Sequence, residues 1–364
     1  MDSIDHENPI HEIHEQGRQN HGCAEQPDDS SCSSAVCGLK GAVTKNWRFR
    51  IPSCFGRSSP ASLPLSSPPA TVYQVWPGKN VFFLDGRVIC GPDPRGLILT
   101  VIAVFLTEWI FLADVVDPSL THPITIAAFS IALAATVIAT LLLTATRDPG
   151  IIPRNRTSPP QEAGTSSVRR TRSRRIVING VERKQKYCRI CDIFRAPRSS
   201  HCAVCDNCVD KFDHHCPWIG QCIGLRNYRF YLLLKALALA FYTYTLAFSV
   251  RRIKVQLDAA AGARLLGLLR SWPEMVALAA FSSMAVCLLA CLLAYHVFLA
   301  AKNQTSHERH KGRYRSSSNP YDRGVLRNIK ECLLIKLPPP RVDFRAVAQP
   351  NFTGSVQQQV TTAN

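Results

Sequence analysis

The chain begins without a long apolar segment, because its first residues, MDSIDHENPIHEIHEQ, are acidic and polar. A secretory signal peptide needs an apolar stretch of about 7–15 residues, so we expect none here. N-myristoylation requires glycine at position two, and Asp2 excludes it. No internal repeat is recognisable in the sequence. Neither of these N-terminal targeting signals is therefore expected.

Apolar residues are concentrated in a few segments, because they make up 46% of the chain while the mean hydropathy is only −0.01. Four runs each have about 20 residues or more, and at about 1.5 Å per residue each can cross an apolar bilayer core of about 30 Å. We predict an integral membrane protein whose fold is all-α. Lys235 lies near the start of the third run, and we expect it to extend its charged end to the membrane interface. The four predicted transmembrane helices are 97–116, 124–146, 230–250 and 276–301.

The distribution of lysine and arginine predicts the orientation in the membrane. Neither residue occurs in the connection between the first two spans, whereas the segment between the second and third is rich in both. Because short, positively charged loops stay in the cytosol, we place that segment and both termini there. The 251–275 loop is then lumenal or extracellular, although its own arginines and lysine oppose this orientation. The span lengths fit the Golgi, the plasma membrane or another endomembrane.

The scarcity of acidic residues, 26 against 43 basic ones, gives a net charge of +17. We attribute this charge to contact between the cytosolic face and anionic lipid headgroups, and we predict no nucleic-acid partner.

The segments outside the spans differ in composition. Residues 1–70 are rich in Ser, Pro, His and charge and are expected to form a disordered cytosolic arm, as are 154–175 and the tail 338–364. The remaining predicted units are a pre-membrane segment 71–96, a basic cytosolic linker 147–185, a cysteine-rich domain 186–229 and a cytosolic C-terminal segment 302–337.

Residues 188–222 hold seven cysteines and three histidines. Two closed structural zinc sites use four ligands each, so eight of these ten groups would bind metal and two would be left over. The pairs Cys188-x-x-Cys191 and Cys202-x-x-Cys205 have zinc-ligand spacing. Disulfides are disfavoured, because the cytosol is reducing and seven cysteines cannot all pair. We therefore predict a cytosolic zinc-binding domain with two Zn²⁺ between the second and third spans.

The surplus cysteine and histidine come mainly from the stretch Asp213-His214-His215-Cys216. Only a thiolate is a good nucleophile, and an ordinary thiol is about 3% ionised at pH 7. An adjacent imidazole can supply the missing ionisation. The residues alone do not decide which of His214 and His215 binds metal, and a zinc module that only folds and binds remains an alternative.

The motifs CxxC, PRSSHCxxCxxC, DHHCPW, CIG and N-x-x-F resemble the DHHC protein S-acyltransferases, also called palmitoyltransferases, and the flanking stretches look like the plant members. The resemblance runs from Val72 to Ala346 and includes all four spans. Asp148-Pro149-Gly150 lies where the family has a turn after the second span. Thr305-Ser306-His307-Glu308 and Asn319-Pro320-Tyr321 with Asn328 resemble family motifs expected to fasten the tail to the zinc-bearing loop. Ser306 replaces the second Thr of the family motif, and Gln221 stands where many members have Asn.

The resemblance also implies a role for each residue of the cluster. Cys216 would be the acylated nucleophile, His214 its base and Asp213 the carboxylate that orients and charges His214. One zinc would take Cys188, Cys191, His201 and Cys208, and the other Cys202, Cys205, His215 and Cys222. In the implied reaction, Cys216 takes a palmitoyl or other long-chain acyl group from acyl-CoA as a thioester. It then passes this group to a cysteine thiol of a membrane-associated protein.

The family also places the acyl chain in a cavity among the four spans. Trp218 would border the thioester, and Phe241 would form a floor that limits chain length. Candidates for contacting the CoA phosphates are Arg195, Arg198, Lys211 and Arg226. Cys332 follows a basic stretch near the membrane and is a candidate for S-acylation.

Two other functions are compatible with the zinc ligands. One is a catalytically silent, zinc-stabilised membrane scaffold, and the other is a membrane ubiquitin ligase with a cross-braced zinc loop. Both leave Cys216 and the Asp213-His214 pair without a purpose, so the sequence favours the acyltransferase.

Overall fold

The computed structural model describes residues 69–118, 120–155, 173–259 and 265–348. The chain divides into two units, Met1–Pro64 and Leu65–Asn364, and all described residues belong to the second. Most of the predicted N-terminal arm, the centre of the basic linker and the end of the tail lie outside the described residues.

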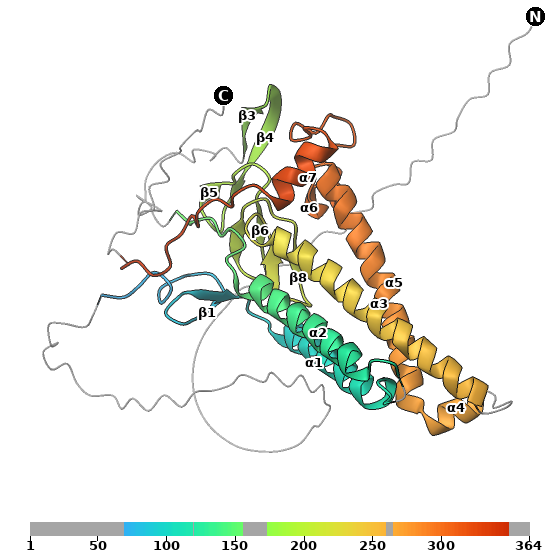
Figure 1. Ribbon diagram of the computed structural model, residues 1–364. Helices are drawn as coiled ribbons and strands as arrows, with labels where there is room; N and C mark the ends of the chain where they lie inside the picture. The colour runs from blue at the N-terminus through green and yellow to red at the C-terminus, as the bar shows by residue number, and fades with distance from the viewer. Residues whose placement is uncertain (1–68, 119, 156–172, 260–264, 349–364) are drawn as a thin grey trace, which may run out of the picture. The chain divides into compact units, whose positions relative to one another are not determined.

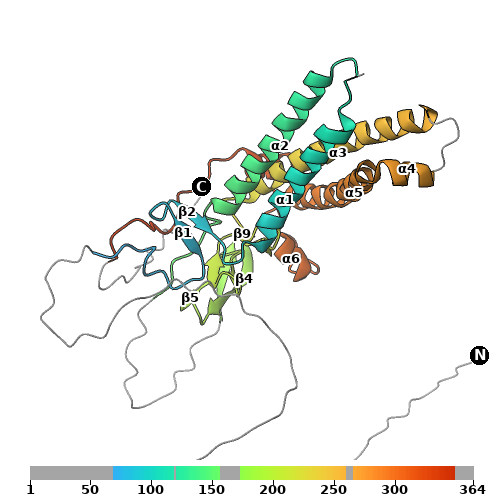
Figure 2. The same cartoon turned by 90° about the horizontal axis from the view of Figure 1, so that it is seen from below.

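Four long helices run alongside one another (Figure 1 and Figure 2). Each is long and apolar enough to cross a membrane, which confirms the four predicted spans and makes the chain a multi-pass membrane protein. Prolines at the first helical position begin the second and the fourth. The long helices are α1 (Arg95–Ile110, continued by the π-helix η1, Phe111–Val115), α2 (Pro123–Thr146), α3 (Tyr228–Ala259) and α5 (Pro273–Ala301).

The boundaries of the third span differ from the prediction. Helix α3 continues to Ala259 rather than ending at 250, and a short helix α4 (Leu265–Ser271) occupies part of the predicted 251–275 loop. Arg252 in the extension forms an ion pair with Asp117, which lies after η1. The basic residues that opposed the charge rule are thus partly carried on a continuation of the helix.

Helix α3 packs against α2 and α5 and forms the centre of the bundle. The buried cluster between the helices contains Val137 and Leu141 of α2, Leu234 and Phe241 of α3 and, at the end next to the cysteine-rich domain, Cys216. The outer faces are apolar and exposed, for example at Trp109 and Ile124. In a membrane, such faces contact lipid, whereas polar groups must be satisfied inside the bundle. Ser130 accordingly donates a hydrogen bond of 2.8 Å to the buried Glu108 carboxylate.

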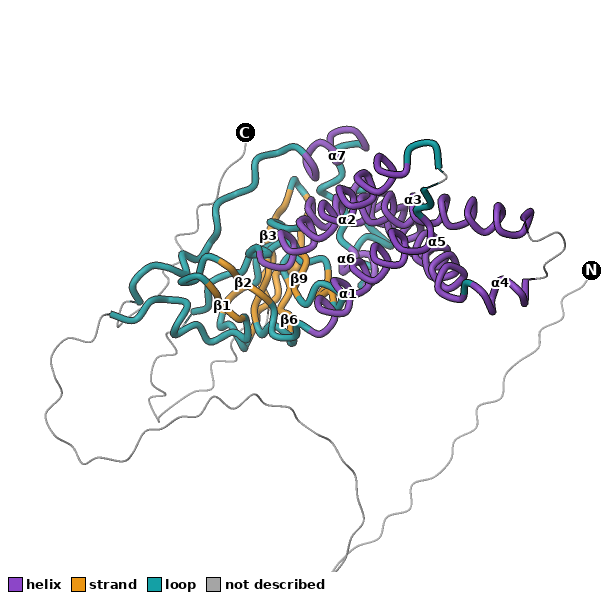
Figure 3. Tube along the Cα trace, turned by 60° about the horizontal axis from the view of Figure 1, so that its bottom comes forward, coloured by secondary structure: helices purple, strands orange, loops and turns teal. Residues whose placement is uncertain are grey.

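Short antiparallel strands gather at one end of the bundle, and α4 lies at the other end (Figure 3). Most have only two or three residues, too few to show an alternating pattern in the sequence. The strands are β1 (Val81–Phe83), β2 (Val88–Cys90), β3 (Ser173–Ile178), β4 (Val181–Cys188), β5 (Ile193–Phe194), β6 (Ser200–Cys202), β7 (Asn207–Val209), β8 (His214–Cys216) and β9 (Gln221–Ile223).

Strands β3 and β4 form a hairpin that the sequence analysis missed. Part of it, Ser173 to Arg175, was expected to be disordered, and the predicted domain boundary at residue 186 falls inside β4. The hairpin turns at Asn179 and Gly180, which both have positive φ angles, of 48° and 76°. Asn-Gly between two strands is a strong hairpin signal, and it outweighs the high density of charge around it.

The segment 338–348 was also expected to be disordered, and this was wrong. Val342 and Phe344 are buried against Val72 and Ile89 of the pre-membrane segment. Backbone hydrogen bonds of 2.9 Å join the two segments, from the N–H of Val72 to the carbonyl of Ala346 and from that of Tyr73 to Phe344. Apolar side chains of the tail thus complete a small core that neither segment could form alone.

Two further helices follow the fourth span, namely α6 (Ser306–His310) and α7 (Val325–Leu333). Thr305 begins α6 with a reciprocal capping box, in which its hydroxyl accepts from the Glu308 N–H while the Glu308 carboxylate accepts from the Thr305 N–H. Helix α7 has a buried Asn328, which donates a hydrogen bond of 2.8 Å to the Ala301 carbonyl at the end of α5. These contacts fasten the C-terminal segment to itself and to the end of α5.

Candidate active site and metal centres

Two groups of four side chains could each hold a metal ion, and they are the two predicted ligand sets. Within each set, the ligand atoms lie within 4.8 Å of one another. All seven cysteines of the 188–222 cluster are free of disulfides. The sets are Cys188, Cys191, His201, Cys208 and Cys202, Cys205, His215, Cys222.

The local fold of each site is the same. A Cys-x-x-Cys turn ends in an aspartate with positive φ, Asp192 at 54° in one site and Asp206 at 53° in the other. Aspartate tolerates this left-handed conformation better than most residues. A hairpin then pairs the histidine with a cysteine across two strands, His201 with Cys208 and His215 with Cys222. The same unit, a Cys-x-x-Cys turn followed by a hairpin that carries a histidine and a cysteine, thus occurs twice, and its two copies overlap along the chain.

The spacing of the ligand atoms fits zinc. With Zn–S of about 2.3 Å and Zn–N of about 2.0 Å, neighbouring ligand atoms in a tetrahedron lie about 3.5–3.8 Å apart. The His201 Nδ1 atom lies 3.4 Å from Cys191 Sγ and 3.9 Å from Cys208 Sγ. The His215 Nδ1 atom lies 3.4 Å from Cys205 Sγ and 3.7 Å from Cys222 Sγ. Both sites are therefore compatible with structural zinc.

Cys216 belongs to neither ligand group. It lies at the end of β8, is buried, and packs at the end of the apolar cluster between the helices. The neighbouring His214 is also outside both groups, which identifies His215 as the ligand-set histidine. The structure therefore places the surplus cysteine and the surplus histidine together at the boundary between the zinc-binding domain and the helices.

Asp213 and His214 form the geometry of a base and its orienting carboxylate. The Asp213 Oδ2 atom lies 2.7 Å from His214 Nδ1, and Asp213 Oδ1 accepts a hydrogen bond of 2.7 Å from the Ser306 N–H. Burial raises the pKa of Asp213, but the hydrogen bond and charge of His214 outweigh burial and hold the pKa below its usual range. Burial lowers the pKa of His214, yet its hydrogen bonds to Asp213 and Cys216 raise it to about 9. The arrangement favours the protonated imidazolium form of His214.

Helix α6 holds Asp213 in place through a buried ion pair. Arg198 donates hydrogen bonds of 3.0 and 2.8 Å to the two carboxylate oxygens of Glu308, and two more of 2.8 Å to Asn303. The side chains of Arg198 and Glu308 are 7% and 0% exposed. Because Ser306 lies between these anchors, its N–H is fixed toward Asp213. The C-terminal motif thus helps to position Asp213 beside His214.

The loop that carries Cys216 is held tightly against the start of α1. A Cβ atom on Gly96 would lie only 1.9 Å from the Pro217 carbonyl oxygen, so no other residue fits there. Thr100 donates a hydrogen bond of 3.0 Å to the Trp218 carbonyl. The Trp218 side chain is 63% exposed and lies next to this junction. Phe241, by contrast, is fully buried in the same apolar cluster as Cys216.

A basic pocket of about 620 Å³ lies beside α6. It is lined by His307, the residue after Ser306, and His307 packs edge-on to Phe212 at 5.3 Å between ring centroids. The pocket is therefore adjacent in sequence to Ser306, whose N–H donates a hydrogen bond to Asp213. Its cationic lining residues are Arg183, Lys184, Lys186, Arg195, Arg198, Lys311 and Arg313.

The structure separates the four predicted phosphate-binding candidates. Arg195 and Arg198 line the basic pocket, although the Arg198 charge is already balanced by Glu308. Lys211 and Arg226 line no part of it. Lys211 lies 3.5 Å from Glu331, and the Arg226 Nε atom lies 3.2 Å from Asp148. The sequence missed Lys311 and Arg313, which are brought to the pocket by the tail.

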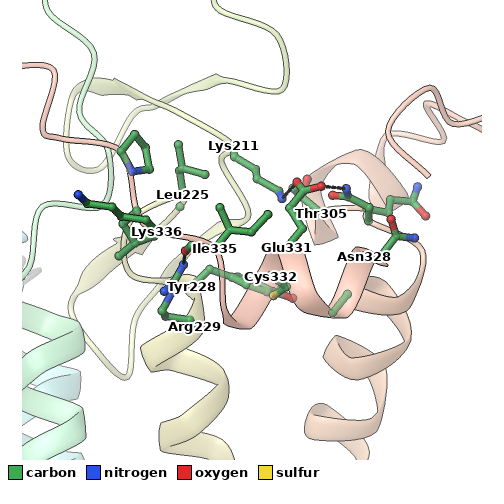
Figure 4. A pocket seen from close by; sticks show the side chains of 16 residues that line it. Lys211, Leu225, Tyr228, Arg229, Thr305, Asn328, Glu331, Cys332, Ile335 and Lys336 are labelled. Atoms are coloured by element: carbon green, nitrogen blue, oxygen red, sulfur yellow. Dashed lines mark hydrogen bonds and ion pairs between the residues drawn. The ribbon is translucent and has the colours of Figure 1, made fainter. Parts of the chain in front are cut away.

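Lys211 instead lines a smaller pocket, of about 150 Å³, between the start of α3, the end of α5 and α7 (Figure 4). Arg229, Cys332 and Lys336 share this lining. Burial raises the pKa of the Cys332 thiol above its usual range, so this cysteine is a poor nucleophile in the folded chain.

A polar cluster between α3 and α5, which we call the α3–α5 polar cluster, was not expected from the sequence. It consists of Tyr228, Tyr231, Lys235 and His296. The Tyr231 hydroxyl lies 3.3 Å from His214 Nε2 and 3.5 Å from His296 Nε2, and the Tyr228 hydroxyl lies 3.2 Å from His296 Nδ1. His296 lies within the apolar fourth span, where an ionisable side chain usually has a functional role or a buried polar partner. This feature of the sequence could have identified the cluster.

Lys235 corrects one expectation. Its side chain does not extend to the surface of the bundle, because the residue is only 5% exposed and its Nζ atom is buried. Nζ lies over the Tyr231 ring, 4.1 Å from the centroid. The seam between α3 and α5 encloses the side chain before it can extend outward.

Comparison with known proteins places these residues in a family. A family model described as DHHC palmitoyltransferase matches residues 181–313. Probable protein S-acyltransferase 7 of Arabidopsis thaliana is 38% identical over 293 residues, which cover 76% of this chain and 66% of that protein. Protein S-acyltransferase 8 of the same plant is 38% identical over 297 residues, with coverage of 76% and 72%. Human Palmitoyltransferase ZDHHC14 is 35% identical over 302 residues, with coverage of 77% and 60%. The chain thus spans about two thirds of the length of these relatives.

Proposed function

We propose, since this chain belongs to the DHHC palmitoyltransferase family, that it is a protein S-acyltransferase that moves a palmitoyl group from acyl-CoA to protein cysteines through Cys216. One observation carries the proposal: Cys216 is the cysteine of the 188–222 cluster that lies outside both metal-ligand groups, and it lies beside the hydrogen-bonded pair of His214 and Asp213. A catalytically silent scaffold has no need for this arrangement.

The first half-reaction loads the enzyme. His214 Nε2 takes the thiol proton of Cys216, while Nδ1–H donates to Asp213, which fixes the tautomer. The thiolate attacks the carbonyl carbon of the acyl-CoA thioester, the bond between that carbon and the CoA sulfur breaks, and His214 returns the proton to CoA. The products are free CoA and a thioester on Cys216.

The second half-reaction repeats these steps with a new thiol. His214 takes the proton of the acceptor cysteine, whose thiolate attacks the Cys216 thioester, and the Cys216 thiol is regenerated. One thioester replaces another in each step, so no external energy source is needed. The protein contributes by ionising thiols and holding both partners close to the reacting carbonyl.

Zinc would be held by the two ligand sets and would supply folding energy to the loop rather than reaction chemistry. Because the sets interleave, both would constrain the stretch from residue 202 to residue 208. His215, a ligand of the second set, lies directly between His214 and Cys216 in β8. Zinc binding at this position would therefore fix the two reacting side chains on either side of it.

The basic pocket supports a site for the phosphates of CoA. Its cations gather beside α6, next to the residue that binds Asp213, and Arg195 is among them. The acyl chain would then extend from Cys216 into the apolar cluster among the helices, where Phe241 is fully buried. Phe241 would limit chain length, and the exposed Trp218 would border the thioester at the membrane surface.

The acceptors would be cysteines of membrane-associated proteins. Cys216 lies where the zinc-binding domain meets the helices, so a thiol held close to the membrane can reach it. We place this domain and both termini in the cytosol, because the segment between the second and third spans is rich in basic residues. The membrane would be that of the Golgi, the plasma membrane or another endomembrane.

Acyl loading tests the function. Purified protein is incubated with a clickable palmitoyl-CoA, and the label is compared between the wild type and Cys216→Ser, with zinc content measured in both. We expect a hydroxylamine-labile label on the wild type and none on the variant at equal zinc content. A zinc-loaded wild type that takes no label would favour the scaffold instead.

A further inference from the structure

Lys235 is a buried amine for which the proposed mechanism has no role. Its Nζ atom has no hydrogen-bond partner among the described residues, and the Tyr231 ring lies beneath it. Burying an unpaired charge costs several kcal/mol after the protein relaxes. A neutral side chain of similar length would avoid this cost, so the presence of lysine calls for a functional explanation.

The surroundings of Lys235 lead directly to the active site. Tyr231, whose ring contacts the Lys235 ammonium, places its hydroxyl 3.3 Å from the catalytic nitrogen of His214. Tyr231 also belongs to the same buried cluster as Cys216. One aromatic side chain therefore separates the Lys235 Nζ atom from His214, which lies two residues from Cys216 on β8. The ammonium is therefore within electrostatic range of the reacting sulfur.

Thioester exchange needs positive charge at this place. When a thiolate adds to the thioester carbonyl, the π electrons move to the oxygen, which carries a full negative charge until a C–S bond breaks. Stabilising such an oxyanion is commonly the largest contribution to catalysis of acyl transfer. Asp213 is negative, His214 handles the proton, and the Tyr231 hydroxyl lies between two imidazoles. His214 is cationic while it holds the thiol proton, but it gives this proton to the leaving sulfur, so none of the three supplies a positive charge that lasts through the whole transfer.

We propose that the Lys235 ammonium supplies this charge and stabilises the oxyanion in both half-reactions. The proposal rests on the acyl transfer proposed above. Lys235 gives up no proton. The electron pair on the oxyanion re-forms the C=O bond when the thiolate of CoA or of Cys216 leaves, so the oxygen never has to be protonated. The Tyr231 ring holds the ammonium in position through its negative face.

Two substitutions of Lys235 and one control test the proposal. Lys235→Met keeps the length and removes the charge, Lys235→Arg keeps the charge, and Lys254→Met removes the same charge at an exposed position near the other end of α3. Single-turnover CoA release is measured over a range of palmitoyl-CoA concentrations up to saturation, followed by transfer to a cysteine peptide. Zinc content and melting temperature are measured for each variant.

We expect Lys235→Met to slow both half-reactions by about 10- to 100-fold at an unchanged half-saturating concentration. Its melting temperature should be unchanged or higher, because an unpaired buried charge is gone. Lys235→Arg should stay within about threefold of the wild type, and Lys254→Met should match it. A role in folding alone predicts the opposite pattern, with rate and melting temperature falling together.

The proposal is overturned if Lys235→Met loads and transfers at the wild-type rate, or if its rate falls only together with its melting temperature. Tyr231→Phe adds a second check, because it keeps the ring beneath the ammonium and removes the hydroxyl. A loss equal to that of Lys235→Met would mean that the effect passes through the hydroxyl rather than through charge. A wild type that releases no CoA would refute the acyl transfer itself, which is a different result.

Discussion

The buried pair of Arg198 and Glu308 provides the sharpest prediction about stability. We consider Arg198→Met, which removes four hydrogen bonds and leaves the Glu308 carboxylate, 0% exposed, without its cation. Glu308 retains only hydrogen bonds from the Thr305 N–H and the Tyr314 hydroxyl. Removing one partner of a buried pair costs about 3–5 kcal/mol of unfolding free energy, mostly from the charge left behind.

The loss should extend to catalysis, because Ser306 in the same segment positions Asp213. We expect Arg198→Met to lower the melting temperature of the purified protein and to reduce acyl loading of Cys216. Arg309→Met is the matched control, because Arg309 follows Glu308 on α6 and its side chain is exposed. Its effect should stay within about 0.5 kcal/mol. The double variant Arg198→Met with Glu308→Leu should recover much of the stability, because it removes both charges.

The reasoning is refuted by either of two results. If Arg198→Met melts no earlier than Arg309→Met, the ion pair does not stabilise the tail. If the double variant is less stable than Arg198→Met, the hydrogen bonds that Glu308 accepts from the Thr305 N–H and the Tyr314 hydroxyl stabilise the tail more than its unpaired charge destabilises it.

The remaining predictions concern the acyl chain, CoA and zinc. Phe241→Ala removes a buried ring from the apolar cluster that contains Cys216, so longer acyl-CoAs should load in a competition assay. We expect a loss of about 3–5 kcal/mol in the free energy of unfolding. An unchanged chain-length profile would contradict this role. Arg195→Gln combined with Lys311→Gln should raise the half-saturating palmitoyl-CoA concentration several-fold, because two pocket cations are lost, whereas Arg175→Gln outside the pocket should not. A strong chelator should remove two zinc ions per chain, measured by mass spectrometry, and abolish acyl loading until zinc is restored. The reason is that the two ligand sets hold the loop that carries His214. Loading that persists without zinc would refute this dependence.

The sequence by itself determined the four membrane spans and the cysteine-rich cluster between the second and the third. Four apolar runs are a property of the chain that needs no folding partner to be read, and all four became long helices. The count of ten Cys and His residues left one cysteine and one histidine over, and the structure sets Cys216 and His214 outside both ligand groups. Ligand spacing and turn chemistry are local, so the order of residues was sufficient.

The tertiary structure decided which of these groups interact across the chain. It placed His215 with the ligands and left His214 to Asp213, a choice that two adjacent identical residues cannot reveal. It neutralised Arg198 with a glutamate from the tail and folded residues 338–348 onto the pre-membrane segment. It also enclosed Lys235, because burial of a side chain depends on the helix packed against it. Charge and hydropathy can be read along the sequence, whereas burial and pairing arise only when distant segments meet.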